Sequence, residues 1–286
     1  MEHQDQISAP ASFVRHSPAA PLNRYIACLW WSRRDTPQHY CEHILPSGGV
    51  QLLFTLHDTP IRCLPGNSPS GQIVWTHSVV HGPQRNHYVA GPKPPGAVVG
   101  VAFHPGAAAS VLGVSMVELA GHHVTLPTIW GRRGTDLHQK IRAAAAPTEI
   151  FRILEEDFSA GLQRSLLVHP AIADALLPHT SIVPTRVRDI QCASGYSPKH
   201  FIALFRTAVG LTPKHYYRIQ RFNSVLRHLA GAERSNLADV AAALGYSDQA
   251  HLTRDFREFA GITPCGYRPQ SAHGHLHHRA SAADRP

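Results

Sequence analysis

Three side chains near the C-terminal end of the sequence, Gln249, Thr253 and Arg254, have the spacing of one exposed helix face and the chemistry to read nucleic-acid bases. A glutamine amide pairs with adenine, an arginine guanidinium donates two hydrogen bonds to guanine, and a threonine methyl group packs on the thymine methyl group. The same predicted face carries Ser247, Ala250 and Arg257. These residues predict a helix that enters the major groove of DNA.

The segment around these residues has the pattern of a helix-turn-helix unit. Residues 236–244 place apolar side chains at helical spacing, Asn236 can cap the start, and Gly245 can adopt the left-handed conformation that ends a helix. We expect Ser247 to cap a second helix after a short turn. The buried face of that helix is predicted to consist of Leu252, Phe256 and Phe259.

The sequence of this unit occurs twice in the chain. Residues 195–213, GYSPKHFIALFRTAVGLTP, align with residues 245–264 at nine identical positions of nineteen when one gap is allowed, where roughly one identity is expected by chance. The outward face of the first unit is predicted to carry Ser197, Lys199, Ile202, Ala203 and Arg206. Because isoleucine and alanine side chains cannot hydrogen-bond to bases, we expect this unit to hold phosphates and read DNA shape, and the second unit to carry more of the specificity.

A long helix that begins at Pro213 is predicted to join the two units and to fix their relative orientation. Lys214 and Arg218 are its predicted phosphate contacts. Charge supports a polyanionic partner: of the net charge of +8, residues 181–270 hold 12 Lys and Arg against 6 Asp and Glu, whereas residues 1–180 hold 13 against 12. A basic C-terminal region of this kind favours nucleic acid.

The rest of the 286 residues predict an α+β chain of two domains. Up to about residue 105, short apolar runs alternate with Gly- and Pro-rich turns, which is typical of an antiparallel barrel or sandwich. A helix capped by Thr148 follows, and it either packs on the β-rich domain or pairs two subunits. The predicted segments are a β-rich domain with helices over 1–125, a helical connector over 126–178, an all-α tandem helix-turn-helix domain over 179–270, and a disordered His-rich tail over 271–286.

The two repeated units resemble the DNA-binding module of the AraC/XylS family of bacterial transcription regulators. The matching features are the G-Y-S turns at 195–197 and 245–247, the pairs Phe205-Arg206 and Phe256-Arg257, the G-L-T-P and G-I-T-P endings, and the linker from Tyr217 to Arg221. The resemblance covers residues 170–270. It implies that two recognition helices enter successive major-groove segments on one face of DNA, with Lys199, Ile202 and Ala203 and then Gln249, Thr253 and Arg254 at the base-reading positions.

The N-terminal half resembles the β-rich sensor domain of some of these regulators, through residues 43–56 and 98–109. Ser47 and Gln51 stand where relatives often have acidic residues, so the resemblance implies a sensor without identifying its ligand. We therefore expect a cytoplasmic bacterial activator or repressor that is not an enzyme and needs no cofactor. Its expected partner is double-stranded DNA, and further candidates are a small-molecule effector, RNA polymerase and a second copy of the chain, with no membrane.

Two other functions are weighed against this one. A non-specific nucleic-acid-binding protein would show a diffuse basic surface in place of two base-reading helices. A metal-dependent β-barrel enzyme fused to a DNA-binding module is suggested by the 22 histidines, but the barrel region contains no HxH or HExxH motif with carboxylate support. The residues therefore predict a regulator with no metal site.

Overall fold

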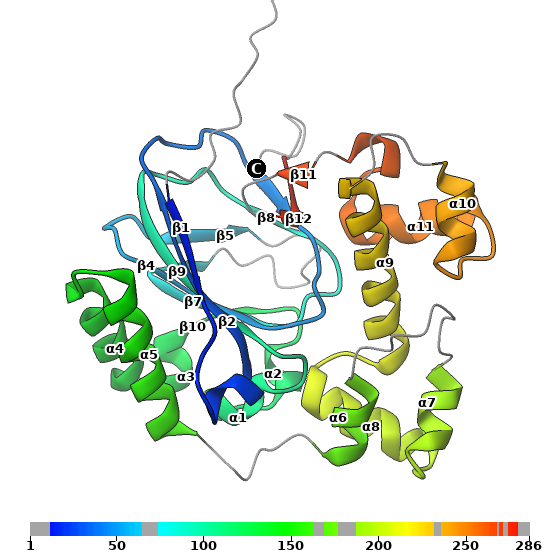
Figure 1. Cartoon of the computed structure of the whole chain (residues 1–286), viewed down its shortest axis with the longest axis horizontal. Coiled ribbons are helices and arrows are strands. Elements are labelled where there is room, and N and C mark those ends of the chain that lie inside the picture. Colours follow the sequence, from blue (N-terminus) through cyan, green and yellow to red (C-terminus); the bar gives the residue numbers. More distant parts are fainter. Residues whose placement is uncertain are drawn as a thin grey trace, which may run out of the picture.

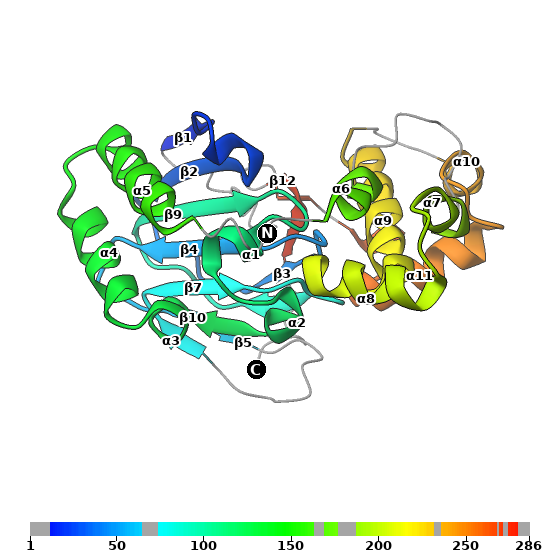
Figure 2. The same ribbon diagram turned by 90° about the horizontal axis from the view of Figure 1, so that it is seen from below.

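The computed structural model describes residues 12–64, 74–162, 169–176, 187–231, 236–267, 269–270 and 274–279. Within these residues, a β-rich domain lies beside a helical domain, as Figures 1 and 2 show. The α+β organisation in two domains is thus confirmed. No helix in the described ranges combines the length and the hydropathy of a membrane span.

The β-rich domain contains two antiparallel sheets that form a sandwich and are not closed into a barrel. In the described residues the first sheet has the order β1 (Ser12–His16), β2 (Ile26–Arg34), β9 (Gly96–Phe103), β4 (Gln51–Thr55), β7 (Ser78–His81) and β10 (His123–Thr125). The second has the order β11 (Pro269–Gln270), β12 (Gly274–Arg279), β3 (Glu42–Ile44), β8 (Tyr88–Ala90), β5 (Ile61–Leu64) and β6 (Val74–Thr76).

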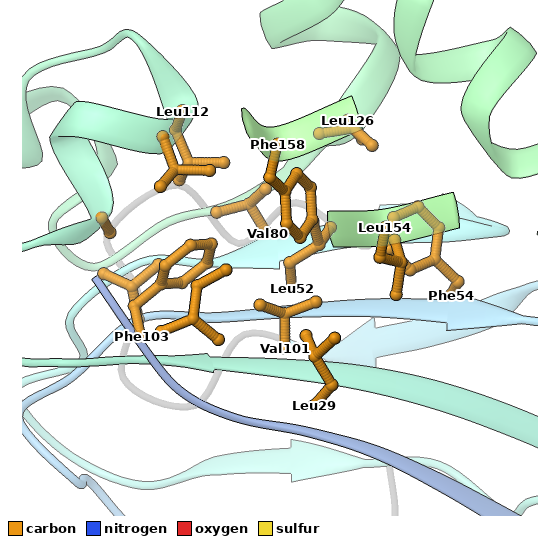
Figure 3. Close-up of a cluster of buried hydrophobic side chains, with 14 of the residues drawn as sticks. Leu29, Leu52, Phe54, Val80, Val101, Phe103, Leu112, Leu126, Leu154 and Phe158 are labelled. Atoms are coloured by element: carbon orange, nitrogen blue, oxygen red, sulfur yellow. The ribbon is translucent and has the colours of Figure 1, made fainter. Parts of the chain in front are cut away.

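The two faces of the first sheet have different roles because successive strand residues point to opposite sides. In β4, Leu52 and Phe54 are fully buried in the domain core, whereas Gln51, Leu53 and Thr55 face a pocket between the sheets. Figure 3 shows the core, in which side chains from the strands meet Leu112, Leu126, Leu154 and Phe158 from the helices. The sheet therefore presents one side to its helices and the other to a cavity.

Helices of the β-rich domain follow β9 along the chain. They are α1 (Ala108–Leu112), α2 (Met116–Leu119), α3 (Leu126–Trp130), α4 (Arg132–Ala143) and α5 (Pro147–Gly161), and a short 3-10 turn, η1 (Leu22–Arg24), precedes β2. Helix α5 buries Ile150, Phe151, Leu154 and Phe158 in the same core, so this helix packs on the β-rich domain. Its first residue is Pro147, and the N-cap is Ala146, so the prediction that Thr148 caps it is wrong.

The helical domain contains both predicted helix-turn-helix units. Its elements are α6 (Pro170–Leu176), α7 (Val187–Ala193), α8 (Pro198–Val209), α9 (Pro213–Gly231), α10 (Leu237–Ala243), α11 (Gln249–Ala260) and the 3-10 turn η3 (Pro264–Gly266). Their apolar faces form a second core around Phe201, Phe205, Phe222 and Phe256, which also takes in Leu45 from the β-rich domain. Because α6 packs in this core, the predicted connector over 126–178 is divided between the two domains.

The last strand differs from the sequence prediction. Residues 271–286 were expected to be disordered, yet residues 274–279 form β12, which pairs with β3 and β11. Backbone hydrogen bonds to the edge of β3 hold this strand in place, although its sequence has no period of apolar residues. The rest of the predicted tail lies outside the described residues.

Candidate nucleic-acid interface

Helix α11 is anchored in the helical domain by its apolar face. Leu252, Phe256 and Phe259 are buried as predicted. The ring of Phe222 on α9 lies 5.1 Å from that of Phe256 and 5.2 Å from that of Phe259. These contacts leave the opposite face of the helix directed away from the core.

The start of α11 lies one residue later than predicted. Asp248 is the N-cap, and its carboxylate accepts a hydrogen bond of 2.6 Å from the backbone N–H of His251. This bond lowers the pKa of Asp248, with a smaller contribution from the Ser247 hydroxyl. Ser247 therefore does not cap the helix, and its Oγ lies 3.1 Å from both Asp248 Oδ2 and His251 Nδ1.

The outward side chains of α11 lie together on an accessible surface. Thr253 is half-buried, and its hydroxyl donates a 2.9 Å hydrogen bond to the Gln249 carbonyl one turn earlier. That bond occupies the hydroxyl within the helix. The other predicted residues of this unit are all exposed, namely Ser247, Gln249, Ala250, Arg254 and Arg257.

Helix α8 has the same design in the first unit. The Ser197 side chain caps it, as predicted, by accepting a hydrogen bond from the His200 backbone N–H at 3.4 Å. Phe201 and Phe205 are buried with 0% exposure, while the Ile202 side chain is 41% exposed. All predicted outward residues of this unit are exposed: Ser197, Lys199, Ile202, Ala203 and Arg206.

Helix α9 is joined to α11 by a buried carboxylate. Asp255, with 5% of its side chain exposed, accepts hydrogen bonds from Arg218 at 2.7 Å and from Arg221 at 3.2 Å. Arg218 also pairs with Glu258 at 2.5 and 3.0 Å, and these hydrogen bonds raise its pKa. The guanidinium of Arg218, a predicted phosphate contact, is thus engaged inside the domain, whereas Lys214 is exposed.

The turn of the second unit is held by the other arginine. Arg221 donates to the Gly245 carbonyl at 3.1 Å, and its guanidinium carbon lies 4.0 Å from the centre of the Tyr246 ring. Burial raises the pKa of Tyr246 to about 12, so the phenol stays neutral beneath the guanidinium. Gly245 adopts the predicted positive φ, at 72°. Linker helix, turn and α11 are therefore connected by charged side chains.

Both outward helices end against the β-rich domain. Gly210 and Gly261, which cap α8 and α11, have φ of 81° and 73°. A Cβ at Gly210 would lie 2.6 Å from the Met116 carbonyl oxygen, and one at Gly261 would lie 2.6 Å from His87 Cε1. The glycines are thus required by backbone conformation and by the closeness of the other domain.

The linker helix also contacts the β-rich domain. Gln220 and the buried Asn223 donate hydrogen bonds to the Ser47 carbonyl at 3.0 and 3.3 Å. Sequence reasoning missed this contact and the role of Asp255. The signal available for Asp255 was a carboxylate on an otherwise apolar helix face, three residues after Leu252.

A pocket of about 400 Å³ lies between the two sheets of the β-rich domain. Phe13, Trp30, Leu53, Ile61 and Val98 supply much of its apolar wall. Its cationic side chains are Arg34, Arg62 and Lys93, and its described lining contains no carboxylate. The lining residues come from segments between residues 13 and 277, which no sequence motif brings together.

Two histidines lie close together at the edge of this pocket. His81 and His123 approach at 2.7 Å between their Nδ1 atoms. Burial lowers the pKa of His123 to about 4 and lowers that of His81 as well, so both imidazoles are neutral at pH 7. Within the described ranges, no group of three His, Cys, Asp or Glu side chains has the arrangement to hold a metal ion.

Comparison with known families matches two parts of the chain. Residues 192–270 match a family described as a helix-turn-helix domain, and residues 14–125 match a domain of unknown function, DUF6597. The first match covers α8 to α11, and the second covers both sheets apart from the C-terminal strands. The division agrees with the two cores of the structure.

Two curated relatives are bacterial proteins. The probable transcription factor PqrA of Proteus vulgaris is 32% identical over 83 residues, which are 29% of this chain and 67% of PqrA. The probable transcriptional regulator LumQ of Photobacterium leiognathi is 27% identical over 82 residues, 29% of this chain and 33% of LumQ. The chain thus spans about a third of one relative and two thirds of the other.

Among solved structures, the chain is similar to ToxT of Vibrio cholerae. A structure of apo ToxT has a TM-score of 0.45 at 10% identity, over 83% of this chain and 95% of ToxT. A structure of ToxT bound to an unsaturated fatty acid has a TM-score of 0.39 at 9% identity, over 90% and 94%. Both likenesses are weak in sequence and in structure.

Proposed function

Because this chain belongs to the AraC/XylS family of transcription regulators, we propose that α8 and α11 read a DNA operator and that the pocket in the β-rich domain receives a small-molecule effector. The observation that carries the first part is the face of α11, where polar side chains stand exposed on a helix fixed from behind by buried aromatic rings. A rigidly held helix of this kind suits direct reading of base edges.

The second unit carries the base contacts in this proposal. Gln249 pairs with adenine and Arg254 with guanine, while Arg257 holds a phosphate. Thr253 presents its methyl group to thymine, which the bond between its hydroxyl and the Gln249 carbonyl favours. Ser247 and Ala250 line the same surface and allow close approach to the groove.

The first unit contributes mostly position and shape. Lys199 and Arg206 bind phosphates on either side of the exposed Ile202, which with Ala203 can contact thymine methyl groups. Ser197 lies at the N-terminus of α8, where backbone N–H groups favour a phosphate. On α9, Lys214 is the remaining phosphate contact, since Arg218 is paired with Asp255 and Glu258.

The pocket is proposed to bind a largely apolar molecule. Most of its lining is apolar, which favours an apolar ligand, and of its cationic side chains Lys93 is paired with the buried Glu42. The chain then needs no catalytic step, and regulation follows from a change in DNA binding. A bacterial protein with these partners acts in the cytoplasm, and contacts with RNA polymerase or a second copy fit the same role.

Selection of bound DNA from a random pool, with the intact protein, tests the proposed function. We expect a defined sequence with two segments about one helical turn apart, and protection of that site in a footprint. Affinity for the selected site should fall as salt rises, because phosphate contacts release counterions. Uniform coverage of DNA, with no enriched sequence, would support a non-specific nucleic-acid-binding protein instead.

A further inference from the structure

The strand that follows the DNA-binding helices returns to the β-rich domain. β12 pairs with β3, with His277 opposite Ile44, and the Leu45 backbone N–H donates to the Leu276 carbonyl at 2.8 Å. In Figures 1 and 2, β12 lies at the boundary between the two domains. The C-terminal strand is therefore part of the sheet that walls the pocket.

Two side chains of β12 reach that pocket. Leu276 lines it and also packs against the core of the helical domain, so one side chain contacts both. His277 lines it beside Lys93, and both bind the same carboxylate oxygen of Glu42, at 3.1 Å from His277 Nδ1 and 2.5 Å from Lys93 Nζ. Glu42 is fully buried, so the hydrogen bond from His277 fixes β12 against β3, while Lys93 balances the charge of the carboxylate. Burial lowers the pKa of His277, which keeps its imidazole neutral in this contact.

The neighbouring strand β3 separates the pocket from the end of α11. Ile44 faces the pocket, and the Glu42 carboxylate lies on the same side. His43 faces the other way, where its Nδ1 donates to the Ala260 carbonyl at 3.3 Å, and Leu45 enters the core of the helical domain. Because alternate residues of a strand face opposite sides, β3 alone lies between the pocket and the C-terminal end of α11.

The contact at the end of α11 involves carbonyl groups that have no partner within the helix. Besides the bond from His43 to Ala260, the His87 backbone N–H donates to the Phe259 carbonyl at 2.9 Å. The last four carbonyls of a helix need partners from outside it. Docking on the β-rich domain supplies two of them, which ties the position of α11 to β3 and its neighbours.

We propose that Leu276 and His277 are ligand-binding residues of the effector pocket, and that a ligand there stabilises the docking of α11 on the β-rich domain. The proposal rests on the pocket being the effector site. A ligand packed against β12 and β3 favours the state in which these strands are paired, and that is the state in which His43 and Leu45 hold the helical domain. By linkage, any event that undocks α11 lowers the affinity for the ligand by the same factor.

The test compares two shortened chains, one ending at residue 279, which keeps β12, and one ending at residue 273, which lacks it. The probe is 1-anilinonaphthalene-8-sulfonate, an apolar anion whose fluorescence rises in apolar surroundings. We expect it to bind the full chain and the longer variant equally, and the shorter variant at least about tenfold more weakly, as loss of apolar contact predicts. In the full chain, bound probe should slow hydrogen exchange in residues 252–261, and removal of β12 should abolish that effect.

If the shorter chain does not fold, the full-length variant L276A tests the contact between Leu276 and the probe. Its matched control is V117A, which removes methyl groups from an exposed side chain on α2. L276A should weaken probe binding and uncouple α11, while V117A should behave as the unmodified chain. Equal binding by all variants, or no binding by the full chain, would overturn the pocket assignment of Leu276.

Two further outcomes separate this proposal from the proposed function. Probe binding that leaves the exchange of α11 unchanged would overturn the coupling, even if DNA selection succeeds. Conversely, failure to select a DNA sequence, with probe binding and coupling as expected, would refute the operator-reading role and leave the coupling intact.

Discussion

Replacing Asp255 by asparagine should loosen the second helix-turn-helix unit. The Asp255 carboxylate has 5% of its area exposed and binds Arg218 at 2.7 Å and Arg221 at 3.2 Å. Both arginines belong to α9, so the carboxylate fixes the linker helix to the reading helix. The asparagine variant keeps the size of the side chain and removes its charge.

The expected loss follows from the partners that remain. Breaking a buried ion pair by removing one partner costs about 3–5 kcal/mol, because the other charge stays uncompensated. Here Arg218 keeps Glu258, and Arg221 keeps the Gly245 carbonyl and the Tyr246 ring. We therefore expect a loss at or below the lower end of that range, about 2–4 kcal/mol, in the stability of the unit.

Hydrogen exchange of the full chain is the suitable assay, since a chain of two domains need not unfold in one step. D255N should increase exchange in residues 236–267 and leave the first sheet unchanged. The matched control is D239N, at an exposed position in the first turn of α10. If D255N raises exchange no more than D239N does, the buried carboxylate does not fix α11 to α9.

Three other variants test separate parts of the structure. F256A should destabilise the second unit by about 3–5 kcal/mol, as loss of a buried aromatic ring does, and unchanged unfolding would contradict the buried face. His123 titrates near pH 4 in the folded chain and near 6.5 when unfolded, so its contribution to stability is present above pH 6.5 and is lost as the pH falls. The free energy of unfolding in urea should therefore drop by about 3 kcal/mol between pH 6.5 and 4, at 1.36 kcal/mol per pH unit, and less in H123Q; equal slopes would exclude His123. D248N keeps a capping side chain and removes a negative charge from the proposed DNA surface, so DNA affinity should rise about twofold to fivefold at low salt, with helix stability unchanged. Unchanged affinity would place the start of α11 away from the phosphates.

The helices could be predicted from the sequence because local patterns specify them. The periodic apolar residues and the Gly245 turn gave both helix-turn-helix units. The predicted N-cap residue is wrong in the second unit only. Ser197 precedes a proline and caps α8, whereas Ser247 precedes Asp248, and the Asp248 carboxylate caps α11. A choice between two adjacent capping residues depends on backbone conformation, which composition does not specify.

Long-range contacts could not be predicted in the same way. Arg218 was expected on DNA because it is basic and on the linker, but its partner Asp255 lies 37 residues away and is brought near by the fold. The pairing of β12 with β3 joins segments more than 200 residues apart, and the His-rich composition of the strand gave no apolar period. Such contacts are set by packing of the two domains.

The central claim, that the outward face of α11 reads bases, is tested most directly by one variant on two DNAs. The selected site and a random duplex are each titrated with the unmodified chain, with R254A, and with R227A as the control for an exposed arginine on α9. R254A should lose about 1–3 kcal/mol of binding free energy on the selected site and little on random DNA, and R227A should change neither. Equal losses by R254A on both DNAs would make Arg254 a phosphate contact and contradict base reading by α11.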